Sequence, residues 1–172
     1  MLQPSPTFQP RYSTNLNMST YSTHLNMSTS TTATVERPHT RLPVPASLRS
    51  AAQQAQALQR PLVLMVTIDN CASCELVRNN YLLPLNRTGE LHALQINMLD
   101  RHTALQDFQG HSSNARALTR LWGVRIAPTL LFFDSQGREV AQRLEGIAVP
   151  EFYGAYLEQR LAQARAAMAQ AR

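Results

Sequence analysis

LVLMVTI, residues 62–68, is an unbroken apolar run of strand length, and DNCASC, residues 69–74, follows it directly. A run of this kind is typical of a central strand that is buried on both faces. Cys71 and Cys74 then fall where the strand ends and a predicted helix begins. A helix N-terminus stabilises an anion, so the first thiol should ionise more easily than a free cysteine. Two thiols placed in this way can open and close a disulfide with little backbone movement, as thiol–disulfide exchange requires.

Cys71 and Cys74 are the only cysteines of the chain, and a pair three residues apart cannot cross-link distant parts of a fold. Besides a redox pair, they could form half of a metal site or an inert pair. Zinc would need two further ligands, and the spacing of His102 and His111 differs from that of usual zinc sites. We therefore interpret the cysteines as a redox pair and predict no metal site.

The charge of the chain comes from 16 basic residues, all of them arginine, and 11 acidic ones, for a net charge of +5. The absence of lysine excludes Schiff-base and lysine-base chemistry. The arginines are scattered singly, so we interpret them as solvated surface residues that form no nucleic-acid-binding patch. We therefore predict no nucleic-acid partner. No stretch approaches the roughly 18 apolar residues of a membrane span.

Residues 1–45 differ in composition from the rest, being rich in Ser, Thr, Asn and Pro. YSTNLNMST, residues 12–20, is followed at once by YSTHLNMST, residues 21–29. A duplication without hydrophobic periodicity cannot bury a core, so we predict a disordered tail over 1–45 and a domain over 46–172. Nothing before Leu62 provides the apolar segment of about 7–15 residues found in secretory signals. Either the protein is cytoplasmic or this tail is not its natural N-terminus.

The rest of the chain reads as alternating helices and strands. Helices are predicted from Pro45 to Pro61, over 72–86 with Pro84 ending or kinking it, over 114–122, and from Pro150 to about residue 169. Strands are predicted over 62–68, 92–99, 129–133 and 138–144, with a polar connection over 100–113. This alternation predicts a mainly parallel sheet with helices on both faces, and a tight turn makes the last strand pair antiparallel.

Three separated features resemble the thioredoxin family. They are the apolar strand leading into Cys71-Ala72-Ser73-Cys74, the segment VRIAPT at 124–129, and the hairpin TLLFFDSQGREVAQRLEG at 129–146 before a last helix. The resemblance covers about residues 46–162 and implies an α/β thioredoxin-like fold, with a central mixed sheet and helices on both faces. It also implies a cis peptide bond before Pro128, packed against the cysteines. Among thioredoxin-related proteins, the "LVLM" strand and the LWGV run at 121–124 are similar to the SoxW-like branch of bacteria.

The chain departs from the family at positions that matter for redox chemistry. Thioredoxins usually carry Trp-Cys-Gly-Pro-Cys, where this chain has Asn-Cys-Ala-Ser-Cys at 70–74. Met65 stands where the family buries an acid, and Gln95 where it has a lysine. The proton shuttle of the family is therefore missing, and its redox potential cannot be carried over. Asp69 or Glu75 could replace the shuttle, although each is more often a solvated surface acid.

The resemblance implies a thiol–disulfide oxidoreductase that needs no organic cofactor. In this interpretation Cys71 attacks a substrate disulfide and Cys74 resolves the mixed disulfide. The main chain of Ala127, just before Pro128, would pair with an extended substrate segment. Supporting positions are Ala72, Ser73 and Thr129.

The partners implied are a disulfide-containing protein substrate and an upstream dithiol reductant, which in the SoxW-like setting is a membrane thiol transporter. The resemblance implies a periplasmic, monomeric reductase. The alternative from another class is a thioredoxin-fold binding or assembly module with redox-inert cysteines, which the missing buried acid favours.

Overall fold

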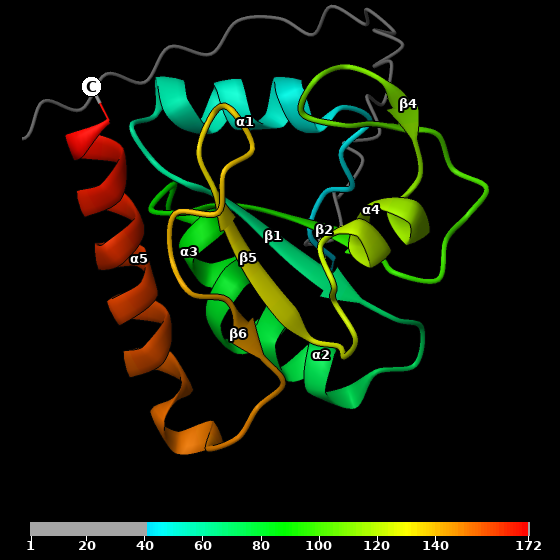
Figure 1. Cartoon of the computed structure of the whole chain (residues 1–172). Coiled ribbons are helices and arrows are strands. Elements are labelled where there is room, and N and C mark those ends of the chain that lie inside the picture. Colours follow the sequence, from blue (N-terminus) through cyan, green and yellow to red (C-terminus); the bar gives the residue numbers. More distant parts are fainter. Residues whose placement is uncertain (1–40, 172) are drawn as a thin grey trace, which may run out of the picture. The chain divides into compact units, whose positions relative to one another are not determined.

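The computed structural model describes residues 41–171, which fold around a four-stranded sheet in the order β2-β1-β5-β6 (Figure 1). The helices are α1 (Leu48–Ala57), α2 (Ala72–Val77), the π-helical turn η1 (Arg78–Leu82), α3 (Leu83–Arg87), α4 (Ala115–Leu121), the 3-10 turn η2 (Pro150–Phe152) and α5 (Tyr153–Gln170). The strands are β1 (Leu62–Thr67), β2 (His92–Asn97), β3 (Leu105–Gln106), β4 (Ser112–Ser113), β5 (Thr129–Phe133) and β6 (Leu144–Glu145). The nine-residue repeat and the rest of the expected tail before Arg41 lie outside the described residues.

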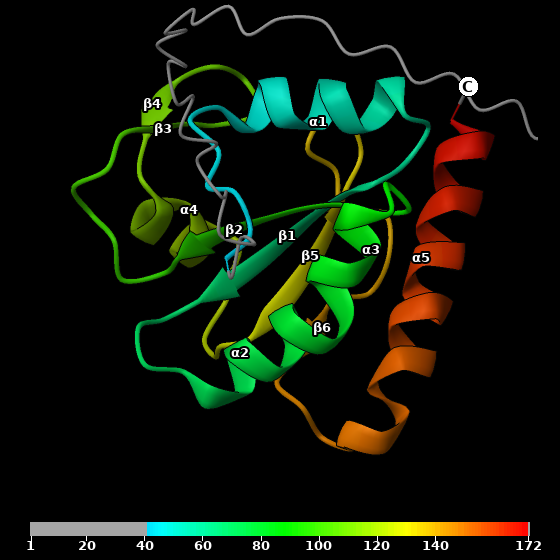
Figure 2. The same cartoon turned by 180° about the vertical axis from the view of Figure 1, so that it is seen from behind.

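The sheet is covered on both faces, and each face has its own apolar cluster. Alternate residues of β1 point to opposite faces. Leu62, Leu64 and Val66 meet α1 and α4, whereas Val63 and Met65 meet the α2–α3 region and α5. The helices lie on these two sides of the sheet in Figures 1 and 2. The α/β fold with helices on both faces is thus confirmed.

The sheet is mixed, as the resemblance implies, and the prediction of a mainly parallel sheet is wrong. β1 and β2 are parallel, but β5 runs antiparallel to both β1 and β6. The difference lies in the connection between β2 and β5, residues 98–128. It carries the β3–β4 hairpin as well as the seven-residue α4, and it returns the chain to the edge of the sheet at which β2 ended. β5 therefore starts at the edge where β1 and β2 end.

The helix after the cysteines continues through Pro84 to Arg87. A proline lacks the N–H that an α-helix would use at this position. The chain adapts by widening into η1, in which the Leu83 N–H donates to the carbonyl of Arg78, five residues back. Pro84 therefore does not end the helix, in contrast to the first of the two outcomes expected for it.

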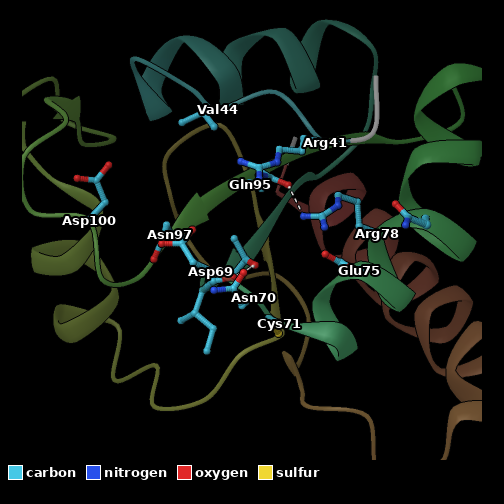
Figure 3. A pocket seen from close by; sticks show the side chains of 13 residues that line it. Arg41, Val44, Asp69, Asn70, Cys71, Glu75, Arg78, Gln95, Asn97 and Asp100 are labelled. Carbon is cyan, nitrogen blue, oxygen red and sulfur yellow. Dashed lines mark hydrogen bonds between the residues drawn. The ribbon is translucent and has the colours of Figure 1, made fainter. Parts of the chain in front are cut away.

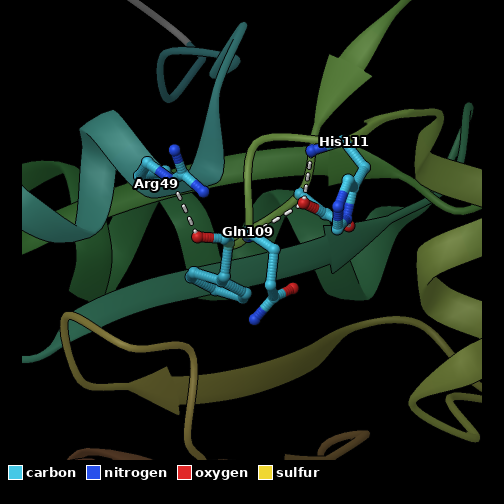
Figure 4. Close-up of polar contacts among 5 residues, drawn as sticks. Arg49, Gln109 and His111 are labelled. Carbon is cyan, nitrogen blue, oxygen red and sulfur yellow. Dashed lines mark hydrogen bonds and ion pairs between the residues drawn. The ribbon is translucent and has the colours of Figure 1, made fainter.

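The connection between β2 and α4 carries the small hairpin β3–β4, which the sequence prediction missed. Its tip is held by Asp107, which accepts backbone hydrogen bonds from Gln109 and His111, and by Arg49 of α1, whose Nε donates to the Phe108 carbonyl at 3.1 Å (Figure 4). β6 is also shorter than predicted. Pairing over 138–144 is reduced to a bridge between Phe133 and Glu139 before Leu144–Glu145.

Residues 41–45 belong to the folded unit, in contrast to the expected tail boundary at 45. Leu42 is 2% exposed and packs in the same cluster as Met65 and Cys74. Its N–H donates to the Gln95 side chain at 3.3 Å, and the Gln95 N–H donates to the Pro43 carbonyl at 2.9 Å. Residues 41–45 lie beside β2 but show no hydrophobic periodicity. The sequence prediction therefore assigned them to the tail by their composition.

Candidate active site

Cys71 and Cys74 are joined by a disulfide with an S–S distance of 2.08 Å and a Cα–Cα distance of 5.2 Å. β1 delivers the chain to this point, and a short loop turns it into α2. Asn70 allows the turn because its φ of +53° lies in the left-handed region, which asparagine tolerates better than most residues. Cys71 is the N-cap of α2, and its Sγ accepts a hydrogen bond from the Cys74 N–H at 3.1 Å.

The two sulfurs differ in burial. Cys74 is 1% exposed and lies inside the apolar cluster that contains Met65 and Val77, whereas Cys71 is half-buried at the edge of that cluster. The flanking Ala72 and Ser73 are exposed. An incoming disulfide can therefore reach Cys71 but not Cys74. Cys71 also has the N-terminal position, where a backbone N–H already points at its sulfur.

The segment before β5 supplies the second part of the site. The Ala127–Pro128 peptide bond is cis. Thr129 holds the bend, because its Oγ1 donates to the Ile126 carbonyl at 2.8 Å. Ala127 is partly buried and packs against the same apolar cluster as Cys71, and no backbone hydrogen bond within 41–171 uses its N–H or carbonyl. The Pro128 carbonyl, in contrast, already accepts from the Gly146 N–H at 2.7 Å.

Behind the cysteines, Met65 and Gln95 stand opposite each other in the β1–β2 register, and both are buried. The cation at this place is Arg78, which sequence reasoning missed. Arg78 follows Cys74 by one helical turn, is only 8% exposed, and donates from Nη1 to Gln95 Oε1 at 3.2 Å (Figure 3). The i,i+4 spacing from a buried cysteine is the signal that could have revealed it.

Arg78 carries its charge in a poorly solvated place. Burial lowers the pKa of its guanidinium, Glu75 counters that effect by raising it, and Arg41 adds a smaller lowering. Within residues 41–171 its Nε has no hydrogen-bond acceptor. The site thus holds a partly compensated cation on the side of the sheet where the family carries an acid.

A polar pocket of about 480 Å³ opens beside Cys71 (Figure 3). The end of β1, the start of α2, the end of β2 and Arg41 form its walls. Asp69 and Glu75 both line it, and within the described part of the chain neither side-chain carboxylate makes a hydrogen bond to a cysteine. Their suggested role as a proton shuttle stays a prediction.

Other candidate groups lie apart from the cysteines. His111 is paired with Asp107 at 3.2 Å on the β3–β4 hairpin. No group of three or more His, Cys, Asp or Glu side chains suited to a metal is found between residues 41 and 171. None of the helices in this same range is long and apolar enough to cross a membrane.

Comparisons with known proteins match the chain to one domain family. The sequence model described as "Thioredoxin-like domain" matches residues 48–161. A comparison with curated protein sequences finds no match.

Solved structures give more distant likenesses. Thioredoxin O2 from Arabidopsis thaliana in the oxidised state is 19% identical and covers 69% of this chain and 93% of its own, with a TM-score of 0.47. A DsbH oxidoreductase is 17% identical over 75% of this chain and 90% of its own, with a TM-score of 0.46. The periplasmic thioredoxin SoxS from Paracoccus pantotrophus is 16% identical over 60% of this chain and 98% of its own, with a TM-score of 0.39.

Proposed function

The chain belongs to the thioredoxin-like domain family, and from this premise we propose that it is a thiol–disulfide oxidoreductase in which Cys71 and Cys74 are the catalytic residues. One observation carries the proposal. The Cys71–Cys74 pair forms a disulfide at a helix N-terminus, with the first sulfur accessible and the second buried. A structural disulfide between residues this close would stabilise little, because it closes a very short loop.

The proposed reaction is the reduction of a protein disulfide. The Cys71 thiolate attacks one sulfur of the substrate, the substrate S–S bond breaks, and the leaving thiolate takes up a proton. The Cys74 thiolate then attacks Cys71 Sγ and releases the second substrate thiol. The substrate gains two electrons and two protons, and the enzyme is left with the Cys71–Cys74 disulfide. An upstream dithiol protein returns it to the reduced form.

Substrate binding is proposed at the Ala127–Pro128 segment. The free backbone groups of Ala127 can pair with an extended peptide as an added strand. Ala127 has a small side chain, which leaves room for substrate side chains of varied shape. Ile126, 48% exposed, offers an apolar contact next to it. Ala72, Ser73 and Thr129 support this arrangement by flanking the sulfurs and holding the bend.

Membership of the SoxW-like branch, a periplasmic location, a monomeric state and electron supply through a membrane thiol transporter are further parts of the proposal. They rest on the LVLM and LWGV similarities in the sequence. The reducing direction is supported by the Ala72-Ser73 dipeptide, which adds no histidine between the cysteines. A reduction potential near the roughly −270 mV of thioredoxin would support a reductase, and one near the roughly −120 mV of DsbA would show an oxidant.

Mixed-disulfide trapping tests the proposed roles. Cys74→Ser should accumulate mixed disulfides with protein substrates, because attack by Cys71 proceeds while resolution does not. Cys71→Ser should trap none, since its remaining thiol is buried. The readout is non-reducing electrophoresis, with dithiothreitol-driven insulin reduction as the activity assay and the Cys71→Ser/Cys74→Ser double variant as control. Equal trapping by both single variants would contradict the assigned asymmetry.

The second candidate function is a redox-inert binding module, favoured by Met65 and Gln95 standing where the family has an acid and a lysine. The same insulin assay separates the two. A wild-type rate no greater than that of the double-serine variant would establish the binding module.

A further inference from the structure

We propose that the pocket beside Cys71 binds a small zwitterionic disulfide, of the kind formed by amino-acid thiols, as a second substrate class. The inference rests on the proposed function, because it uses Cys71 as the nucleophile. It goes beyond that function in assigning a binding site to a part of the molecule other than the Ala127–Pro128 segment.

The pocket and that segment lie on different sides of Cys71. The pocket is lined by Gln95 and Asn97 of β2, whereas Pro128 leads into β5. The sheet order β2-β1-β5 places β1, which delivers Cys71, between the two. A volume of about 480 Å³ lies within the size range of small-molecule sites, about 300–1,000 Å³. A compact ligand can therefore enter from the β2 side and reach the same sulfur.

One end of the pocket is cationic. Figure 3 shows Arg41, Arg78 and Gln95 grouped there, with Glu75 beside Arg78. Within the described residues the guanidinium of Arg78 donates to Gln95 and leaves Nε without an acceptor, although the side chain is only 8% exposed. A buried guanidinium whose Nε is unused favours an acceptor, and a carboxylate matches its planar geometry best. This end fits the carboxylate of a ligand.

The other end is acidic. Asp100 lies on the far side of the pocket in Figure 3, with Asn97 and Asp69 between it and the arginines. Hydrogen bonds from Thr103 and His102 lower the pKa of Asp100 to about 2, so its carboxylate stays charged at neutral pH. With two arginines and three carboxylates in its walls, the pocket is unsuited to a simple anion. It suits a ligand that carries an amine and a carboxylate together.

Cystine is the simplest disulfide of this class, because each half carries both groups next to its sulfur. The reduced Cys71 thiolate attacks one sulfur, the S–S bond of cystine breaks, and one cysteine leaves and takes a proton. Cys74 then attacks Cys71 Sγ and releases the second cysteine. Cystine is reduced by two electrons, the enzyme dithiol is oxidised to the Cys71–Cys74 disulfide, and the upstream dithiol protein supplies the electrons for the next cycle.

The test is a charge series of small disulfides reacted with the pre-reduced full chain. The probes are 2-hydroxyethyl disulfide (neutral), cystamine (amines only), dithiodiglycolate (carboxylates only) and cystine. Each second-order rate is divided by the rate of the same disulfide with dithiothreitol, which removes differences in intrinsic reactivity. We expect the normalised rate of cystine to exceed the other three by about tenfold, as one charge-assisted hydrogen bond would give.

Variants connect this preference to the pocket. Arg41→Gln and Asp69→Asn change exposed side chains and should each reduce the cystine preference several-fold. Arg78→Lys, which keeps the charge but loses the planar fork, should reduce it as well. Arg120→Gln on α4, which does not line the pocket, is the matched control and should leave the preference intact. A cysteinylated protein carries the same cysteine group attached to a polypeptide and serves as a further probe. If Arg41→Gln lowers the rate with this protein more than the rate with cystine, the pocket is assigned to protein-bound cysteine.

Equal normalised rates for all four probes would overturn the proposal and leave the reduction of protein disulfides standing. A preference for cystine that survives Arg41→Gln, Asp69→Asn and Arg78→Lys together would also overturn it, because another part of the surface would then be responsible. If the pre-reduced chain reacts with none of the probes and does not reduce insulin, the proposed function itself fails.

Discussion

Among single residues, Gln95 joins several parts of the site through hydrogen bonds. Its side-chain oxygen accepts from the Leu42 N–H and from Arg78, and its own N–H donates to Pro43. A neutral amide can accept twice where the lysine of related proteins would only donate. The residue that replaces the lysine thus fixes a buried cation and the segment before α1 at the same time.

Leu42 gives the first residue-scale prediction. The side chain is 2% exposed, so Leu42→Ala should cost about 2–5 kcal/mol of unfolding free energy through lost burial and the cavity left behind. Val44→Ala is the matched control, because Val44 is 62% exposed and its truncation should stay within about 0.5 kcal/mol. Urea unfolding of both variants measures the difference. Equal midpoints would mean that residues 41–45 do not pack on the domain.

The side chain of His92 should make the stability of the protein depend on pH. Its Nε2 is buried without a partner in the described chain, and burial, followed by the nearby charge of Arg60, lowers its pKa from the ordinary 6.5. Below that pH the unfolded chain binds a proton that the folded chain resists, so stability should fall as the pH drops. His92→Gln should weaken this loss between pH 8 and pH 5. His102→Gln, an exposed control, should keep the wild-type slope in urea unfolding.

Among the elements, the β5–β6 turn and the β3–β4 hairpin depend on each other. Gly137 closes the turn with a φ of +80°, and a Cβ built there would overlap the ring of Phe108. That ring packs against the ring of Phe133 in a tilted arrangement, with a centroid distance of 4.8 Å and an interplanar angle of 56°. The β3–β4 hairpin, which the sequence prediction missed, therefore packs directly on the turn at Gly137, which was predicted.

Gly137→Ala should consequently destabilise the protein by more than about 1 kcal/mol, because both the backbone conformation and the Phe108 contact are lost. Gly123→Ala is the control. Gly123 also has a positive φ, +67°, but nothing lies within 4 Å of an added Cβ. Thermal unfolding of the two variants separates backbone strain from the clash, and an equal loss in both would show that Phe108 yields without cost.

The elements also show what a sequence can predict. The bounds of β5 were predicted correctly and those of β1 to within one residue, because both strands are apolar on both faces and so form continuous runs. β3, β4 and β6 have two residues each, too few to show a period of two. Cys71 and Cys74 could be identified from spacing alone. For Arg78 the only signal was its i,i+4 spacing from Cys74, and that signal is weak because an arginine on a predicted helix is far more often solvated than buried.

At the scale of the folded unit, the sheet separates two cores with different tasks. The α1–α4 side holds aliphatic side chains and a group of rings, whereas the other side holds Cys74 and the residues behind it. The direction of β5, the one feature that alternation predicted wrongly, brings the Ala127–Pro128 segment to the edge where β1 releases Cys71. The mixed sheet is thus what places the two parts of the site together.

The single tryptophan lies on the side of the sheet away from the cysteines. Trp122 packs against both Phe108 and Phe133, at centroid distances of 6.3 and 5.3 Å, beside the α1–α4 core. The β-sheet stands between its indole and the sulfur atoms. We therefore expect its emission to follow unfolding of that core and to change little when the disulfide opens or closes. Fluorescence is consequently a clean optical measure of stability for this protein in either oxidation state, and a poor one of turnover.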